Sequence, residues 1–195
     1  MAEQRTPRAW GVWNLPNALT MVRIALVPVF LVLLLQDTTA SRWWAVVVFV
    51  AASVTDQLDG HIARARDIVT PFGILMDPIA DKALTLGAFV ALSVLGEVPW
   101  WVTILIAVRE LGITALRAAL VRRSIMPASM GGKVKTVLQM LAIVLLVVPW
   151  AAFTAAAVPH AVALVVLYAA LAVTVVTGVD YCVRGWRLAR QPAAS

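Results

Sequence analysis

The sequence contains six apolar segments of membrane-spanning length, and these segments constrain the fold more than any other feature. They cover residues 18–36, 43–62, 74–95, 99–121, 134–152 and 159–183. A helix of about 20 apolar residues crosses the hydrocarbon core of a bilayer. In lipid, the polar groups of its backbone must be satisfied internally, which favours helices. The sequence therefore predicts an all-α integral membrane protein with six transmembrane helices.

The composition also indicates a chain whose solvent is lipid. Hydrophobic residues make up 62% of the 195 residues and charged residues only 13%, whereas about a quarter of the residues in soluble domains are charged. The single cysteine, Cys182, excludes an internal disulfide. We expect an N-terminal cytoplasmic or interfacial segment (1–17), a six-helix transmembrane domain (18–184) and a cytoplasmic tail (185–195).

Basic residues gather on one side of the predicted topology. The net charge is +6, and the bases concentrate near both termini and in the second-to-third and fourth-to-fifth connections, while the other side has only Arg42, beside Asp37 and Glu97. Because cytoplasmic loops collect Lys and Arg, both termini are predicted to be cytoplasmic. Topology explains this charge without nucleic acid, and a second use, binding an anionic substrate, stays open.

Half of the ten acidic residues lie in the stretch TDQLDGHIARARDIVTPFGILMDPIADKA. Asp56 and Asp59 are three residues apart, and Asp77 and Asp81 are four apart in the next apolar segment. Residues three or four apart share a helix face, so each pair forms a stripe along its helix. Two helices joined by a short connection are antiparallel neighbours, and their stripes can face each other. Asp67 is off both stripes and is interpreted as a solvated loop residue.

Four carboxylates near a bilayer repel one another and are costly to desolvate. Partial protonation would relieve the repulsion, and so would bound cations. Oxygen ligands favour hard ions such as Mg²⁺, Mn²⁺ or Ca²⁺, and a pair of ions suits phosphoryl displacement. A cation or proton transporter would also hold acids, but along a path that crosses the bilayer. These acids cluster near one side, which favours a metal site.

The acidic stretch reads D-x-x-D-G-x-x-A-R, eight residues, then G-x-x-x-D-x-x-x-D. This pattern resembles the signature of the CDP-alcohol phosphatidyltransferases, and the match is complete. The resemblance implies the six-helix fold of that family and an enzyme in which an alcohol displaces CMP from CDP-diacylglycerol. It also implies two divalent cations, Mg²⁺ or Mn²⁺, a homodimer, and a bacterial plasma membrane with the active site facing the cytoplasm.

The resemblance implies a role for each matching position. Asp56, Asp59 and Asp77 would bind the metal pair, and Asp81 would contact the second ion and act as the general base. The remaining positions would contact CDP-diacylglycerol: Gly60 and Ala63, which leave room for the nucleotide, Arg64, which holds the diphosphate, Gly73 of the motif, Thr70 in the connecting turn, and Asn17 and Thr20 in the first segment.

Blocks outside the acidic stretch bear on the acceptor alcohol. NLPNALTMVRIALVP, VRELGITALR and GGKVKT resemble family members that use glycerol-3-phosphate. An acceptor phosphate needs a basic pocket, and its candidates are Arg109, Arg117, Lys133 and Lys135. Arg109 has the alternative of pairing with Glu110 or a motif acid, and both lysines that of being cytoplasmic loop charges. Inositol phosphate, serine and phosphatidylglycerol, the acceptors of sister enzymes, stay open.

Overall fold

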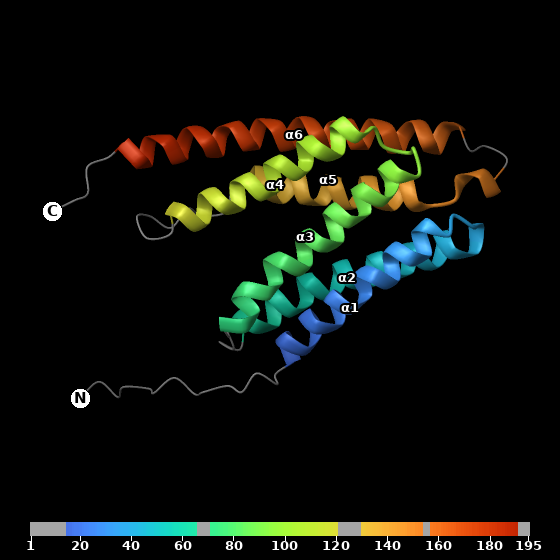
Figure 1. Cartoon of the computed structure of the whole chain (residues 1–195), viewed down its shortest axis with the longest axis horizontal. Coiled ribbons are helices and arrows are strands. Elements are labelled where there is room, and N and C mark those ends of the chain that lie inside the picture. Colours follow the sequence, from blue (N-terminus) through green and yellow to red (C-terminus); the bar gives the residue numbers. More distant parts are fainter. Residues whose placement is uncertain (1–14, 66–70, 121–129, 154–156, 191–195) are drawn as a thin grey trace.

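A computed structural model describes the backbone of residues 15–65, 71–120, 130–153 and 157–190, and the side chains of 17–56, 76–116, 131–153 and 157–183. Within this part, the chain is all-helical (Figure 1). The elements are α1 (Leu15–Leu35), α2 (Thr39–Ala65), α3 (Pro71–Val94), α4 (Trp100–Leu120), α5 (Met130–Val147), the 3-10 turn η1 (Trp150–Ala152) and α6 (Ala157–Arg190). The predicted helical fold is confirmed.

Local signals account for where the helices begin and end. Before α2, the amide of Ser41 donates to the hydroxyl of Thr38, and the amide of Thr38 donates to the hydroxyl of Ser41, both at 3.1 Å. This reciprocal pair caps the helix start. After α3, Gly96 has a φ of 78°, and the amide of Glu97 donates to the carbonyl of Leu92. Glycine tolerates this left-handed conformation, which ends the helix.

The fifth helix is shorter than predicted. The apolar segment extends to residue 152, but α5 ends at Val147 and the chain continues into η1. Pro149 lacks a backbone amide hydrogen and restricts the residue before it, so the helix cannot continue through this position. The indole of Trp150 then donates to the carbonyl of Leu145 at 2.6 Å and holds the turn against the end of α5.

The helices form two groups that converge at one end of the molecule. α1 packs against α2 and α3, while α6 packs against α4 and α5, and contacts of α3 with α4 and of α5 with α2 and α3 join the groups. Figure 1 shows that the groups diverge toward the end where α1 begins and α6 ends. α2 and α4 also end there, and α3 and α5 begin there. The described helices thus bring the motif, the start of α1 and the end of α6 to the same end.

The converging half contains the apolar core. Its largest fully buried members are Phe30, Leu34, Phe49, Phe89, Leu92, Ile106, Ile143, Leu146 and Leu167. Alanines such as Ala52, Ala88 and Ala142 are also fully buried, and small residues let membrane helices approach closely. Large apolar side chains on the outer faces of the helices are exposed instead, including Val32, Val108 and Val165. This outer surface suits lipid.

Two of the described helices are long and apolar enough to pass a strict test for a membrane span. They comprise Asn17–Leu35 in α1 and Ala157–Val183 in α6. The other four helices carry polar or charged residues near the motif end or near their connections. An apolar helical protein is therefore established, while six crossings of the bilayer and the side on which the termini lie stay predictions.

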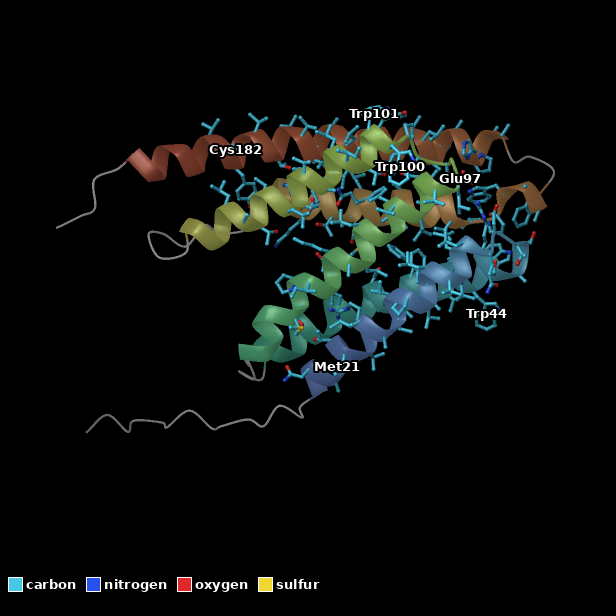
Figure 2. The ribbon with its side chains drawn as sticks, viewed as in Figure 1. Met21, Trp44, Glu97, Trp100, Trp101 and Cys182 are labelled. Carbon is cyan, nitrogen blue, oxygen red and sulfur yellow. The ribbon has the colours of Figure 1, made fainter. Side chains whose placement is uncertain are left out.

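An ion-pair network joins the connections at the converging end. Arg42 at the start of α2 binds Asp37 at 2.6 Å and Glu97 at 2.8 Å. Figure 2 shows Glu97 and Trp44 toward this end, and Met21 and Cys182 toward the other. The sequence placed these three charges on one side, and the structure brings them into direct contact.

The core makes a prediction about stability. Phe49 is 1% exposed and packs on Phe30, with ring centroids 5.4 Å apart, so Phe49→Ala leaves a cavity. We expect a loss somewhat below the about 3–5 kcal/mol found in soluble cores, because lipid also solvates the unfolded side chain. Unfolding in detergent measures the loss. Val47 is 53% exposed, so the control Val47→Ala should change stability little, and equal losses would contradict this packing.

Candidate active site

Helix α1 holds two of the motif aspartates. The hydroxyl of Thr20 donates to Oδ1 of Asp77 in α3 at 2.6 Å. Three residues further along α1, the guanidinium of Arg23 binds Oδ1 of Asp56 in α2 at 2.7 Å. Residues three apart lie on one helix face, so one face of α1 positions an acid from each motif helix.

Arg23 is buried although its guanidinium is charged, and polar partners compensate for its loss of water. Its side chain is 1% exposed, and besides the ion pair its Nε donates to the carbonyl of Ala52 at 3.3 Å. Ala52 and Asp56 are one turn apart on α2, so Arg23 spans one turn of that helix. Asn17, on the same side of α1, is also buried. Arg23 was absent from the predicted site, although an arginine inside an apolar segment is costly without a partner.

The chemistry of the described acids fits a hard divalent cation. Asp77 is exposed and the side chain of Asp56 is 32% exposed, so both offer carboxylate oxygens that an ion can reach. Among the side chains that the structure describes, no three His, Cys, Asp or Glu residues form a metal-holding group. The side chain of Asp59 is outside that set, so the four-carboxylate arrangement stays a prediction.

Several other predicted positions also lie outside the described residues. Thr70 falls in a segment whose backbone is not described. At five helical positions the structure describes the backbone alone: Gly60, Ala63, Arg64, Gly73 and Arg117. Their proposed contacts with CDP-diacylglycerol or with an acceptor phosphate stay predictions.

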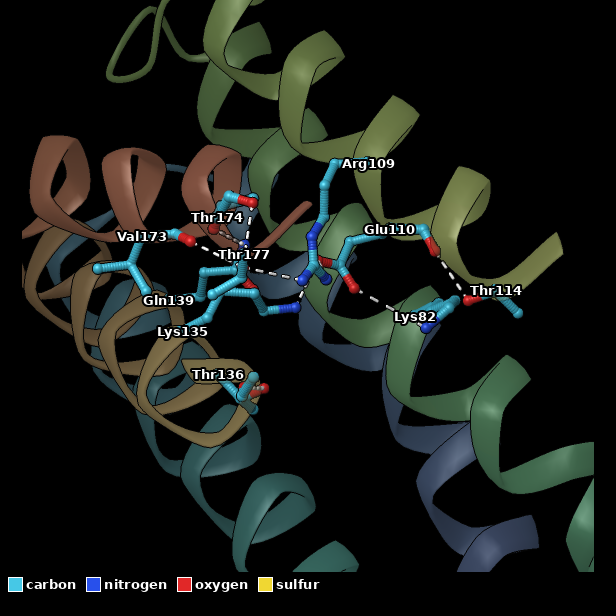
Figure 3. Close-up of polar contacts among 11 residues, drawn as sticks. Lys82, Arg109, Glu110, Thr114, Lys135, Thr136, Gln139, Val173, Thr174 and Thr177 are labelled. Atoms are coloured by element: carbon cyan, nitrogen blue, oxygen red, sulfur yellow. Dashed lines mark hydrogen bonds and ion pairs between the residues drawn. The ribbon is translucent and has the colours of Figure 1, made fainter. Parts of the chain in front are cut away.

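A second polar group, which we call the basic cluster, consists of Lys82, Arg109, Glu110 and Lys135 (Figure 3). Glu110 is its centre, because its carboxylate contacts all three bases. Lys135 binds Oε1, Arg109 binds the same oxygen at 3.1 Å, and Lys82 lies 3.9 Å from Oε2. The three bases come from α3, α4 and α5, so the cluster joins three helices.

Helix α6 positions Arg109. Its guanidinium donates to the hydroxyl of Thr177 at 3.0 Å, and Thr177 donates in turn to the carbonyl of Val173 at 2.7 Å. A Cβ built on Gly178 would lie 3.1 Å from Cγ of Arg109. The absence of a side chain at Gly178 therefore lets Arg109 pass close to α6.

A small recess connects Asp81 to the basic cluster. Its lining residues come from α3, α4 and α5: Asp81, Lys82, Thr85, Leu86, Glu110, Lys135, Thr136, Gln139 and Met140. The predicted base and three members of the basic cluster thus line the same recess. Its volume is about 10 Å³, room for about one water, so a larger polar molecule would enter only if lining side chains moved aside.

The predicted acceptor residues reach different places. Arg109 and Lys135 meet in the basic cluster, and Arg109 pairs with Glu110, which was one of the alternatives. Lys133 is exposed. It precedes the buried Lys135 by two residues, and two residues along a helix turn a side chain through about 200°. The structure does not bring Lys133 to Arg109. From the sequence, Glu110 was considered only as a partner for Arg109. An acid within an apolar segment is costly, and this position was the signal for a functional role.

The ion pair between α1 and α2 makes a second prediction. Arg23→Met leaves Asp56 without this partner, and we expect a loss of about 1–3 kcal/mol, since Asp56 is partly solvated. Asp56→Asn removes the other half. The free energy of unfolding is measured for both single variants and the double variant, in detergent without added cations. The double variant should lose at least about 0.5 kcal/mol less than the sum of the two single losses. Strictly additive losses would show that the pair contributes nothing.

Known proteins resemble this chain over most of its length. The family described as CDP-alcohol phosphatidyltransferase matches residues 13–176. A Mycobacterium tuberculosis protein named probable phosphatidylglycerophosphate synthase is 48% identical over 177 residues, which cover 89% of this chain and 82% of that protein.

Two further relatives are named CDP-diacylglycerol–glycerol-3-phosphate 3-phosphatidyltransferase. The one from Bacillus subtilis is 34% identical and covers 90% of this chain and 96% of its own length. The one from Escherichia coli is 40% identical over a stretch that covers 67% of this chain and 75% of that protein. The family match includes the whole acidic motif and the basic cluster, and with these relatives it establishes that the chain belongs to the CDP-alcohol phosphatidyltransferase family.

Proposed function

We propose that this protein transfers the phosphatidyl group of CDP-diacylglycerol to glycerol-3-phosphate, giving phosphatidylglycerophosphate and CMP. The observation that carries the proposal is the recess that joins Asp81 to the basic cluster. Its lining brings a proton acceptor and cations close together, which is what an alcohol that carries a phosphate requires. The names of the relatives from B. subtilis and E. coli state this donor and this acceptor.

The motif end of the bundle would bind the donor. Asp56, Asp59, Asp77 and Asp81 would hold two divalent cations, Mg²⁺ or Mn²⁺, which when bound neutralise negative charge on the transferred phosphate. Thr20 and Arg23 orient two of these acids through the contacts described above. The other positions named for CDP-diacylglycerol, among them Arg64 and Thr70, would contact the nucleotide.

Asp81 would act as the general base. A carboxylate within reach of the acceptor hydroxyl accepts its proton while the hydroxyl oxygen bonds to the lipid-linked phosphorus. The bond between that phosphorus and the CMP oxygen breaks, and CMP leaves. Fixing the acceptor in the recess makes the attack effectively intramolecular, which lowers the entropic part of the barrier.

The basic cluster would bind the acceptor's phosphate. Arg109 and Lys135 are largely buried, and buried charge-assisted hydrogen bonds to phosphate are strong. Within the described part of the chain, Nε of Arg109 is buried and has no hydrogen-bond acceptor, so its donors are not all used. Lys82 directly follows Asp81 in the sequence, so one cation of the phosphate site and the residue that would accept the proton lie next to each other on α3.

The cellular setting follows from the same proposal. Six transmembrane helices in a bacterial plasma membrane would place the motif end at the cytoplasmic surface, where the nucleotide of a membrane-bound donor meets a water-soluble acceptor. The exposed apolar faces of the helices would contact lipid and, in a homodimer, a second copy.

A substrate panel tests the proposal. The purified protein is incubated with CDP-diacylglycerol, Mg²⁺ or Mn²⁺ and one alcohol at a time, and CMP release is followed. We expect release with glycerol-3-phosphate and its loss with EDTA. Turnover only with inositol phosphate, serine or phosphatidylglycerol would assign a sister reaction, and ion flux without any lipid product would indicate a transporter.

The base assignment predicts the behaviour of Asp81→Asn. Because the amide cannot accept the hydroxyl proton, CMP release should fall by about 10²- to 10⁴-fold, while CDP-diacylglycerol binding is largely retained. Binding of the labelled donor to the purified variant measures the second point. Asp67→Asn, in the same stretch but outside the motif, is the matched control. Normal turnover of Asp81→Asn would contradict this role.

The two lysines of α5 give a matched pair for the acceptor site. Lys135→Gln removes a buried cation from the basic cluster, and we expect the KM for glycerol-3-phosphate to rise about 10- to 100-fold, since a hydrogen bond to a charged group contributes about 1.5–3 kcal/mol. Lys133→Gln removes an exposed charge two residues away and should change this KM little. Equal effects of the two substitutions would refute the assignment of Lys135.

A further inference from the structure

The inference in this subsection concerns Glu110 and rests on the proposed function. Its carboxylate occupies the centre of the basic cluster, where it contacts Lys82, Arg109 and Lys135. A carboxylate and a phosphate are both oxyanions and use the same N–H donors. Glu110 thus already holds the donors that the acceptor's phosphate would need, and the two anions compete for them.

The charges of the cluster fit this competition. Three bases around one carboxylate leave a net of two positive charges. A phosphate monoester carries about −1.5 to −2 at pH 7. When the carboxylate of Glu110 leaves Lys135 but stays close to the cluster, the net charge of the cluster matches that of one phosphate monoester. Without Glu110 it would carry a further positive charge and would hold the phosphate more tightly.

The geometry lets the carboxylate of Glu110 move while Arg109 stays in place. Thr114 fixes the backbone carbonyl of Glu110 and does not contact its carboxylate, and the Glu110 side chain itself lines the recess. Its contact with Lys82 is 3.9 Å long, close to the 4 Å limit of an ion pair. Arg109 is held independently by Thr177 and by its packing on Gly178. Arg109 therefore does not need Glu110 to keep its position.

The reaction gives a reason for such a competitor. Transfer of the phosphatidyl group leaves the acceptor's phosphate monoester unchanged, so product and substrate present the same group to the same cations. A cluster that bound this group with all of its charge would retain the product, and uniform tight binding does not raise kcat.

We propose that Glu110 is a built-in competing anion for the phosphate-monoester site. Binding of the acceptor displaces the carboxylate from Lys135 and Arg109, and its return displaces the monoester of the product. Glu110 is in this sense a positioning residue that acts on the cluster and not on the reacting atoms. The alternative is a scaffold, in which Glu110 holds the bases in place for phosphate and its loss weakens binding.

Glu110→Gln separates the two roles, because it keeps the size of the side chain and removes its charge. The full-length protein in detergent is titrated with inorganic phosphate, and both the phosphate-dependent rise in unfolding temperature and the inhibition of CMP release are measured. A competitor predicts that phosphate binds about tenfold or more tightly in Glu110→Gln. The KM for glycerol-3-phosphate should fall, and inhibition by added product should strengthen. Weaker or unchanged phosphate binding would overturn the proposal.

Glu110→Asp keeps the charge and shortens its reach, so phosphate affinity should lie between those of the wild type and Glu110→Gln. This second variant decides the question if Glu110→Gln does not fold: unchanged or weaker phosphate binding by Glu110→Asp would also overturn the competitor role. The wild type separates this failure from failure of the proposed function. If it releases CMP with glycerol-3-phosphate and the variants do not bind phosphate more tightly, only the role of Glu110 is wrong. If the wild type neither binds phosphate nor uses glycerol-3-phosphate, the proposed function itself is wrong.

Discussion

Charges buried among apolar helices need partners, and the pairing of Arg23 with Asp56 shows how this requirement shapes the protein. A lone arginine inside α1 would be expelled from an apolar bundle. Its ion pair to α2 and the hydrogen bond from Thr20 to Asp77 in α3 fix α1 beside both motif helices. The same contacts that make the helix tolerable in lipid also orient the acids of the site.

The two ends of the bundle use polar groups in different ways. At the converging end, Arg42 has both of its carboxylate partners and joins connections that surround the apolar core. At the motif end, three bases share one carboxylate next to a recess. One base between two carboxylates leaves one negative charge at the converging end, where the side chain of Asp37 is 51% exposed to solvent. Three bases around one carboxylate leave two positive charges on side chains that are mostly buried, and buried charge is costly unless it is paired. The burial of this excess charge beside a recess, more than the presence of charge, marks the second group as functional.

Much of the fold could be predicted from the sequence, because apolar length and helix punctuation are local properties. The helices lie close to the predicted segments, and the early end of α5 follows from Pro149, a residue visible in the sequence. Helical spacing also predicts that the acids of each pair share a face, which stays a prediction because the side chain of Asp59 lies outside the described residues. It could not predict that Arg23 reaches Asp56 or that Glu110 contacts three bases, since these contacts depend on how α1, α3, α4 and α5 cross. The spacing of residues in one helix does not encode its rotation against another.

The three-residue spacing of Thr20 and Arg23 has a consequence for the shape of the site. The rise along a helix is 1.5 Å per residue, so the two contact points on α1 are about 4.5 Å apart along its axis. Helix α1 therefore couples an acid of α2 to an acid of α3. A tilt of this one helix would shift both contact points together and would disturb both acids at once.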